Sequence, residues 1–251
     1  MTLLPLLISA LLALQPAQPK PDAPAATAPA PKSDDLSARL DALDKKIAAI
    51  KDLSADFEQQ KKTALLKKPL TSSGTIKLKG DKTRWDTTKP HPTVMTIDAK
   101  EVRIYYPQQK TVEVYPVQGE MAKLASSPLP RIPVIREQFD IAEIKATDID
   151  ANATGDLLAL SLTPKSNALK ENIDTIRVMV DLTTACARTV EIKDADGDLT
   201  TITFTSIRVD AGISDKDVEL TTPKGTTTSR PLEGGAPKQP DAPSPKPEVK
   251  K

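Results

Sequence analysis

Few residues of this chain are of the types that carry out chemistry. His91 is the only histidine and stands between two prolines, and Cys186 is the only cysteine. A Ser-His-Asp triad or a histidine-containing metal site would have to use His91, and a single cysteine forms no disulfide within the chain. The sequence has no glycine-flanked serine elbow and no phosphate-binding glycine loop. We therefore expect a protein that is not an enzyme and that uses no cofactor or metal.

Three alternating aspartates, Asp194, Asp196 and Asp198, are the strongest alternative to that expectation. A helix–loop–helix calcium site needs glycine at its sixth position and a bidentate glutamate at its twelfth. Counted from Asp194, Gly197 comes fourth and Thr205 comes twelfth. The segment is more typical of a tight turn between two strands than of a metal site.

Overall composition excludes further classes of function. The chain has 35 Lys and Arg against 34 Asp and Glu, so no overall positive field attracts nucleic acid. Aromatic residues make up only 3% of the chain, which argues against stacking platforms for bases.

Both ends of the chain differ in composition from the middle. Residues 1–18 are expected to be a signal peptide, because their apolar run is shorter than the about 20 residues of a membrane helix. No basic side chain precedes the run, so an uncleaved N-terminal anchor is the alternative. Residues 19–33 form a Pro/Ala-rich linker and residues 226–251 a disordered Pro/Lys-rich tail. One folded domain is therefore expected over residues 34–225.

A helix opens this domain. Apolar residues recur at spacings of three and four, which places them on one stripe of a helix: Leu36, Leu40, Leu43, Ile47 and Ile50. Leu53 and Phe57 continue this stripe. This period predicts an amphipathic helix from about Asp35 to at least Asp52 that packs on a sheet.

Beyond residue 69 the period changes to two. Expected strands are 75–79, 83–87, 93–98, 101–106, 111–117, 139–149, 157–163, 174–182, 186–194, 199–209 and 218–221. Their tight turns indicate an antiparallel arrangement. The proline-rich residues 117–137 interrupt the pattern, with one helical turn expected near 121–125, and are predicted to lie over one mouth or edge of the sheet. The fold class is α+β, mainly β: a strongly curved antiparallel sheet of about eleven strands.

One face of such a sheet would be aliphatic and concave, which suits alkyl chains rather than small polar substrates. The residues predicted to line it are Phe57, Ile76, Leu78, Trp85, Val102, Ile104, Leu158, Leu160, Leu162, Ile176, Val178 and Val180. The alternative interpretation of Trp85 is a core residue packed where sheet and helix meet.

Three segments form an ordered set: the expected helix end Leu53-Ser54-Ala55-Asp56-Phe57-Glu58-Gln59, the run Gly74-Thr75-Ile76-Lys77-Leu78 followed by Arg84-Trp85-Asp86, and Leu160-Ser161-Leu162-Thr163-Pro164-Lys165. In this order they resemble the LolA-type periplasmic carriers of outer-membrane lipoproteins. The resemblance covers about residues 36–225.

The resemblance implies an unclosed barrel of about eleven strands, covered by the N-terminal amphipathic helix and a short lid segment. It also implies a monomeric periplasmic protein that takes acylated lipoproteins from an inner-membrane exporter to an outer-membrane acceptor. Some members hold the lid closed with an arginine six residues before the tryptophan; Lys79 stands there in this chain, so Lys79 and Arg84 are the latch candidates. An envelope lipid-binding sensor or structural module of the same fold, which transfers no cargo, is the alternative.

Overall fold

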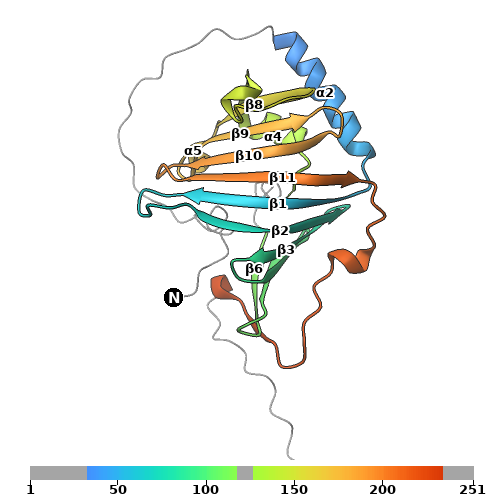
Figure 1. Ribbon diagram of the computed structural model, residues 1–251, viewed down its shortest axis with the longest axis vertical. Helices are drawn as coiled ribbons and strands as arrows, with labels where there is room; N and C mark the ends of the chain where they lie inside the picture. The colour runs from blue at the N-terminus through green and yellow to red at the C-terminus, as the bar shows by residue number, and fades with distance from the viewer. Residues whose placement is uncertain (1–32, 118–126, 234–251) are drawn as a thin grey trace, which may run out of the picture.

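The computed structural model describes residues 33–117 and 127–233, and about half of them belong to one twelve-stranded sheet (Figure 1). Its strands are β1 Asp52–Lys62, β2 Leu70–Lys79, β3 Lys82–Lys89, β4 Thr93–Ile97, β5 Glu101–Tyr106, β6 Thr111–Pro116, β7 Phe139–Ile144, β8 Leu157–Pro164, β9 Ile173–Asp181, β10 Cys186–Asp194, β11 Leu199–Val209 and β12 Thr227–Ser229. The helices are α2 Ser33–Ala49, α4 Ile132–Gln138 and α5 Asn167–Lys170, with 3-10 turns η1 Ala146–Asp148, η2 Asp215–Val218 and η3 Pro231–Glu233.

The strand order is β12-β6-β5-β4-β3-β2-β1-β11-β10-β9-β8-β7. Every pair is antiparallel except β12, which lies parallel to β6. Strands β12 and β7 therefore form two separate edges, and the sheet does not close into a barrel. The predicted fold class, mainly β with an unclosed sheet and an N-terminal helix, is confirmed, with twelve strands in place of about eleven.

The first helix is shorter than predicted. Helix α2 ends at Ala49, and β1 begins at Asp52, so the prediction that Leu53 and Phe57 continue the helical stripe is wrong. Buried Leu53, Ala55 and Phe57 alternate with more exposed residues along β1, which is the period of a strand. The error arose because Phe57 comes four positions after Leu53, and a spacing of four fits both the helical and the strand period.

Other boundaries also moved. Helix α4 occupies the end of the stretch predicted to be irregular, because a proline in the first turn of a helix blocks no internal hydrogen bond. Strand β7 ends at Ile144 rather than at residue 149. No strand forms at 218–221: the 3-10 turn η2 ends at Val218, and residues 219–221 are irregular. Strand β12 and turn η3 lie within the stretch predicted to be a tail. Residues 1–32, 118–126 and 234–251, which include the predicted signal peptide and the predicted turn at 121–125, lie outside the described residues.

Helices α2 and α4 pack on one face of the sheet, which we call the inner face. Leu40 and Leu43 of α2 and Ile132 and Ile135 of α4 join the inner-face residues of β7–β10 in one buried cluster. In Figure 1, α4 lies behind these strands and α2 runs along the end of the sheet. Arg39 of α2 also forms an ion pair with Glu143 of β7, at 2.6 Å. No helix in the described part of the chain is long and apolar enough to span a membrane.

The opposite, outer face is crossed by the chain that follows β11. This outer-face segment, residues 211–226, buries Val218 and brings Leu220 against Tyr105 and Val112. It then adds β12 to the edge strand β6 (Figure 1). The sheet is thus covered by helices on its inner face at one end and by irregular chain on its outer face at the other.

Candidate functional site

Three aromatic rings occupy the centre of the inner face. Phe57 of β1 contacts Trp85 of β3 edge to face, with ring centroids 4.7 Å apart, and Phe204 of β11 lies 5.9 Å from Trp85. Strand β2 runs between Phe57 and Trp85, and its residue opposite Phe57 is Gly74. Gly74 lies beside this ring contact, and a Cβ there would meet the backbone of β3 at the Asp86 carbonyl oxygen.

All predicted lining residues lie on the inner face. Cross-strand register connects Ile76 to Trp85, and Leu160 to Val178, and the other members continue the same rows. They fall into two clusters rather than one. The first contains Phe57, Ile76, Leu78, Trp85, Val102 and Ile104; the second contains Leu158, Leu160, Leu162, Val178 and Val180, with Ile176 packed against it.

The two clusters are covered differently. Helices α2 and α4 cover the second cluster. Outside the sheet, the described hydrophobic residues that pack against the first cluster are Ile50, Val117 and Leu129, none of which belongs to a helix. The first cluster, over β1–β6 and β11, is therefore the candidate binding surface, and its use for ligands stays a prediction.

A polar end adjoins this surface. Gln59 follows Phe57 on the inner face of β1 and is completely buried, and neither its amide nitrogen nor its amide oxygen has a hydrogen-bond partner among the described residues. Its neighbours across the sheet are Ser72 and Ile202. One row further, Lys61 lies between Asp194 and Asp198, with its Nζ 3.7 and 3.2 Å from their carboxylates. Sequence analysis missed Gln59 as a site residue, although the alternation along β1 places it beside Phe57.

A second polar group lies near the β6 edge of the same face. The Glu113 carboxylate accepts hydrogen bonds from the hydroxyls of Tyr106 and Tyr115, at 3.0 and 2.9 Å. Burial, with the neighbouring carboxylate, raises the pKa of both tyrosines above the usual value, so both remain protonated donors. Tyr105, the neighbour of Tyr106 in β5, points to the outer face, because successive side chains of a strand alternate between faces.

Lys79 and Arg84 lie on the outer face. Arg84 donates to the Asp86 carboxylate at 2.8–3.0 Å and to the backbone carbonyl of Glu219 at 2.5 Å. Lys79 lies 3.8 Å from Asp215. Both contacts are with β3 or with the outer-face segment, because alternation along β2 and β3 points these side chains away from the helices. This geometry does not fit a latch between the sheet and a lid on its inner face.

Reactive groups are sparse around the inner face. Burial raises the pKa of the Cys186 thiol to about 11, which keeps it protonated and unreactive. His91 is exposed in the turn between β3 and β4. Among the described residues, no three His, Cys, Asp or Glu side chains group so as to hold a metal ion. The arrangement offers apolar contact area and a few neutral hydrogen-bonding groups.

Comparison with known families connects this geometry to a recognised group of proteins. The family described as "Outer membrane lipoprotein carrier protein LolA" matches residues 48–219, which run from the end of α2 to the outer-face segment. The chain belongs to this family. The resemblance stated from the sequence is thereby confirmed. The family description is that of a carrier rather than of an enzyme.

Solved structures with a similar fold share little sequence with this chain. A conserved protein of Thermus thermophilus has a TM-score of 0.50 at 11% identity, covering 78% of this chain and 99% of its own. A LolA superfamily protein of Nitrosomonas europaea has a TM-score of 0.41 at 9% identity, covering 73% and 97%. Lipoprotein LppX of Mycobacterium tuberculosis has a TM-score of 0.45 at 6% identity, covering 75% and 100%. Comparison with curated proteins finds no match.

Proposed function

We propose that this protein is a periplasmic carrier that shelters the acyl chains of lipoproteins against the inner face of β1–β6 and β11. The proposal is carried by the apolar surface itself, which continues from Phe204 and Phe57 through Trp85 to Ile104. An acyl chain needs contact area and little direction, and each sheltered CH₂ contributes about 0.8 kcal/mol. A few chains would therefore bind tightly enough to be carried and weakly enough to be released.

Gln59 supplies the polar contact in this proposal. An acyl chain reaches its parent molecule through an ester or amide linkage, whose carbonyl accepts a hydrogen bond. The buried amide of Gln59 lies beside the aromatic centre, and no described residue pairs with its donor or its acceptor. The linkage would pair with Gln59 while its chain extends over Phe57 and Trp85.

By family membership the donor would be an inner-membrane exporter and the recipient an outer-membrane acceptor. Mass spectrometry of the protein purified from its native envelope is expected to find retained acylated lipid or lipoprotein. Incubation of that loaded protein with acceptor membranes should then release the acylated molecule. Retention without release would instead favour the lipid-binding sensor of the same fold, and the absence of any acyl chain would refute both.

Ligand contact with the aromatic centre has a direct optical test, because Trp85 is the only tryptophan in the chain. Titration with a long-chain fatty acid is expected to change its emission. Phe57→Leu removes a ring that touches Trp85 and should weaken binding about fivefold. Tyr105→Leu, which removes a buried ring from the outer face, is the matched control and should leave binding unchanged. Equal affinities in the two variants would contradict this location.

A further inference from the structure

The turn between β1 and β2 exposes two adjacent leucines. Leu65 is 91% exposed and Leu66 is 47% exposed. The turn has a defined shape, because the Leu66 N–H donates to the Thr63 carbonyl at 3.2 Å and the Leu65 N–H to the Thr63 hydroxyl at 3.4 Å. Single exposed leucines are common on protein surfaces, but an adjacent pair at the tip of a hairpin forms an exposed apolar patch that could contact a partner.

Lysines surround this pair. Residues 61–70 read KKTALLKKPL and contain four lysines and no acidic residue, although the net charge of the whole chain is only +1. Lys61 is neutralised by Asp194 and Asp198. Lys62, Lys67 and Lys68 are exposed, and no ion pair within the described residues involves them. Asp196 is the remaining acidic residue of the adjoining β10–β11 turn, against the three exposed lysines of the tip, so the tip keeps a local positive charge.

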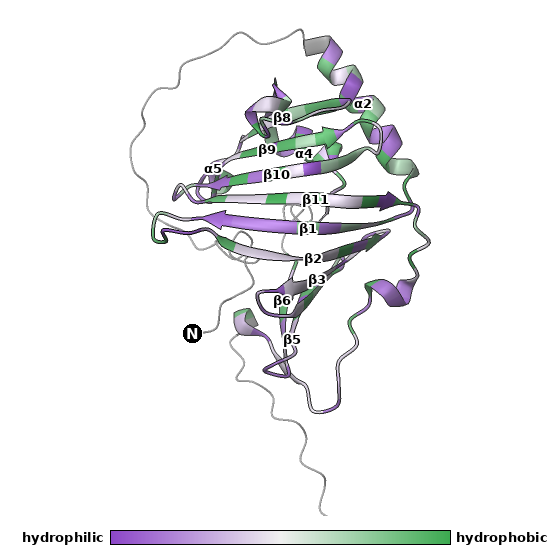
Figure 2. Cartoon of the chain, in the orientation of Figure 1, coloured by the Kyte–Doolittle hydropathy of each residue, from purple (hydrophilic) through white to green (hydrophobic). Residues whose placement is uncertain are grey.

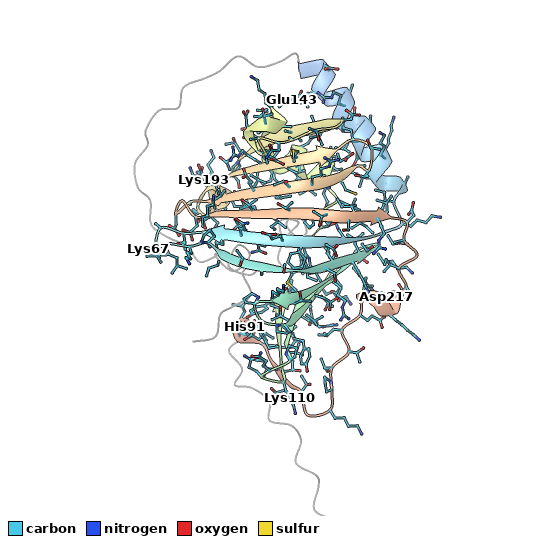
Figure 3. All side chains as sticks on the ribbon, in the orientation of Figure 1. Lys67, His91, Lys110, Glu143, Lys193 and Asp217 are labelled. Carbon is cyan, nitrogen blue, oxygen red and sulfur yellow. The ribbon has the colours of Figure 1, made fainter. Side chains whose placement is uncertain are left out.

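The hairpin tip projects beyond the neighbouring strands, at the end of the molecule away from α2 (Figure 1). In Figure 2 its apolar residues contrast with the polar end of β1, and Figure 3 shows Lys67 at the outer limit of that end. A projecting tip offers far less than the about 800 Å² per partner that a stable protein interface uses. It suits the boundary of a bilayer, where leucines reach the acyl region and lysines meet lipid phosphates.

We propose that the β1–β2 hairpin tip, residues 62–68, docks the protein on membranes that contain anionic phospholipid. Leu65 and Leu66 enter the bilayer boundary, and Lys62, Lys67 and Lys68 contact the phosphate groups. This docking surface is separate from the inner face and operates whether or not the inner face carries acyl chains. The tip also follows directly from the strand end that holds Gln59 and Lys61, so docking brings the polar end of the inner face toward the lipid.

The first test is co-sedimentation of the full chain with vesicles of phosphatidylcholine, with and without phosphatidylglycerol. Binding is expected to favour the phosphatidylglycerol vesicles and to weaken with added salt. The double variants Leu65→Ser/Leu66→Ser and Lys67→Gln/Lys68→Gln should each weaken it about tenfold. The matched controls are Leu232→Ser, an exposed leucine elsewhere, and Lys110→Gln/Lys224→Gln, two exposed lysines elsewhere. Equal loss in variants and controls, or no loss in the variants, would overturn the proposal.

A local probe separates the hairpin from any other membrane contact of the chain. An environment-sensitive dye attached through Leu65→Cys is expected to shift its emission to the blue on phosphatidylglycerol vesicles, whereas the same dye at Lys224→Cys should not shift. Cys186 is buried and does not compete for the label. An unshifted dye at position 65 on vesicles that bind the protein would place the contact elsewhere. The proposal would also be overturned if the unmodified chain bound no vesicles and Leu65→Ser/Leu66→Ser lost binding to a protein partner. The tip would then be a protein interface.

Discussion

Gln59 places an amide donor and an amide acceptor on an apolar face, and neither has a hydrogen-bond partner in the described part of the chain. A buried polar group without a partner costs about 1–3 kcal/mol. Gln59→Leu, similar in volume, is therefore expected to raise the free energy of unfolding of the ligand-free protein by about 1–3 kcal/mol in urea denaturation. Gln60→Leu is the control, because Gln60 is less buried and donates to Glu58. A loss of stability in Gln59→Leu would show that the amide is satisfied inside the folded protein.

Gly74 is required by the close approach of two backbones. A Cβ at this position would lie 1.9 Å from the Asp86 carbonyl oxygen and 2.9 Å from the Thr87 Cα. Because both are backbone atoms of β3, the strands must separate, and Gly74→Ala is expected to cost at least about 3 kcal/mol. Gly80→Ala meets no atom within 4 Å and should cost only about 1 kcal/mol for its positive φ. Equal urea midpoints for the two variants would contradict the close approach.

Within the elements, the β9–β10 turn depends on one carboxylate. Asp181 accepts hydrogen bonds from the backbone N–H groups of Thr183 and Thr184, at 2.8 and 3.3 Å, and from the Arg188 guanidinium. Burial acts to raise the pKa of Asp181, but these bonds together hold it below its usual value. The charged form is therefore favoured in the folded state.

This lowered pKa sets the sign of a pH dependence. Stability from Asp181 is present above the pKa of the unfolded chain and is lost as the pH falls through the lower, folded pKa. Asp181→Asn is expected to cost about 1–3 kcal/mol at neutral pH and progressively less in acid. The loss of stability is measured by thermal denaturation at pH values from neutral to acidic. Asp174→Asn is the control, because Asp174 forms a more exposed ion pair, with Lys193. A cost that stays constant down to low pH would contradict the assignment.

At the scale of the whole molecule, the outer-face segment holds the β1–β6 end of the sheet by burial more than by charge. Its ion pairs, such as Lys79 with Asp215, are exposed and contribute less than about 1 kcal/mol each. Val218, in contrast, is 3% exposed. Val218→Asp should release the segment and make residues 211–226 sensitive to limited proteolysis, whereas Lys79→Gln should leave them protected. Protection in both variants would mean that β12 alone anchors the segment.

Much of the fold follows from local pattern. The alternation in Ile76 and Leu78, or in Leu160 and Leu162, predicts which side chains share a face, and the structure places them accordingly. The same alternation puts Lys79 and Arg84 on the other face, because each directly neighbours an inner-face residue, Leu78 or Trp85. Their position away from the helices was therefore already implied by the sequence. The latch hypothesis came from family resemblance and overlooked that alternation.

Other features depend on contacts between residues far apart in the chain. The sequence by itself determined the mainly antiparallel class, the opening helix and the aliphatic face, because each depends on a period within a short segment. Only the tertiary structure decided that Phe57 belongs to a strand, that Gln59 is buried without a partner, and that Leu65 projects at a hairpin tip. Pairing of β1 with β11 joins residues about 150 positions apart. Burial and register at such positions are set by the partner strand, which no local period specifies.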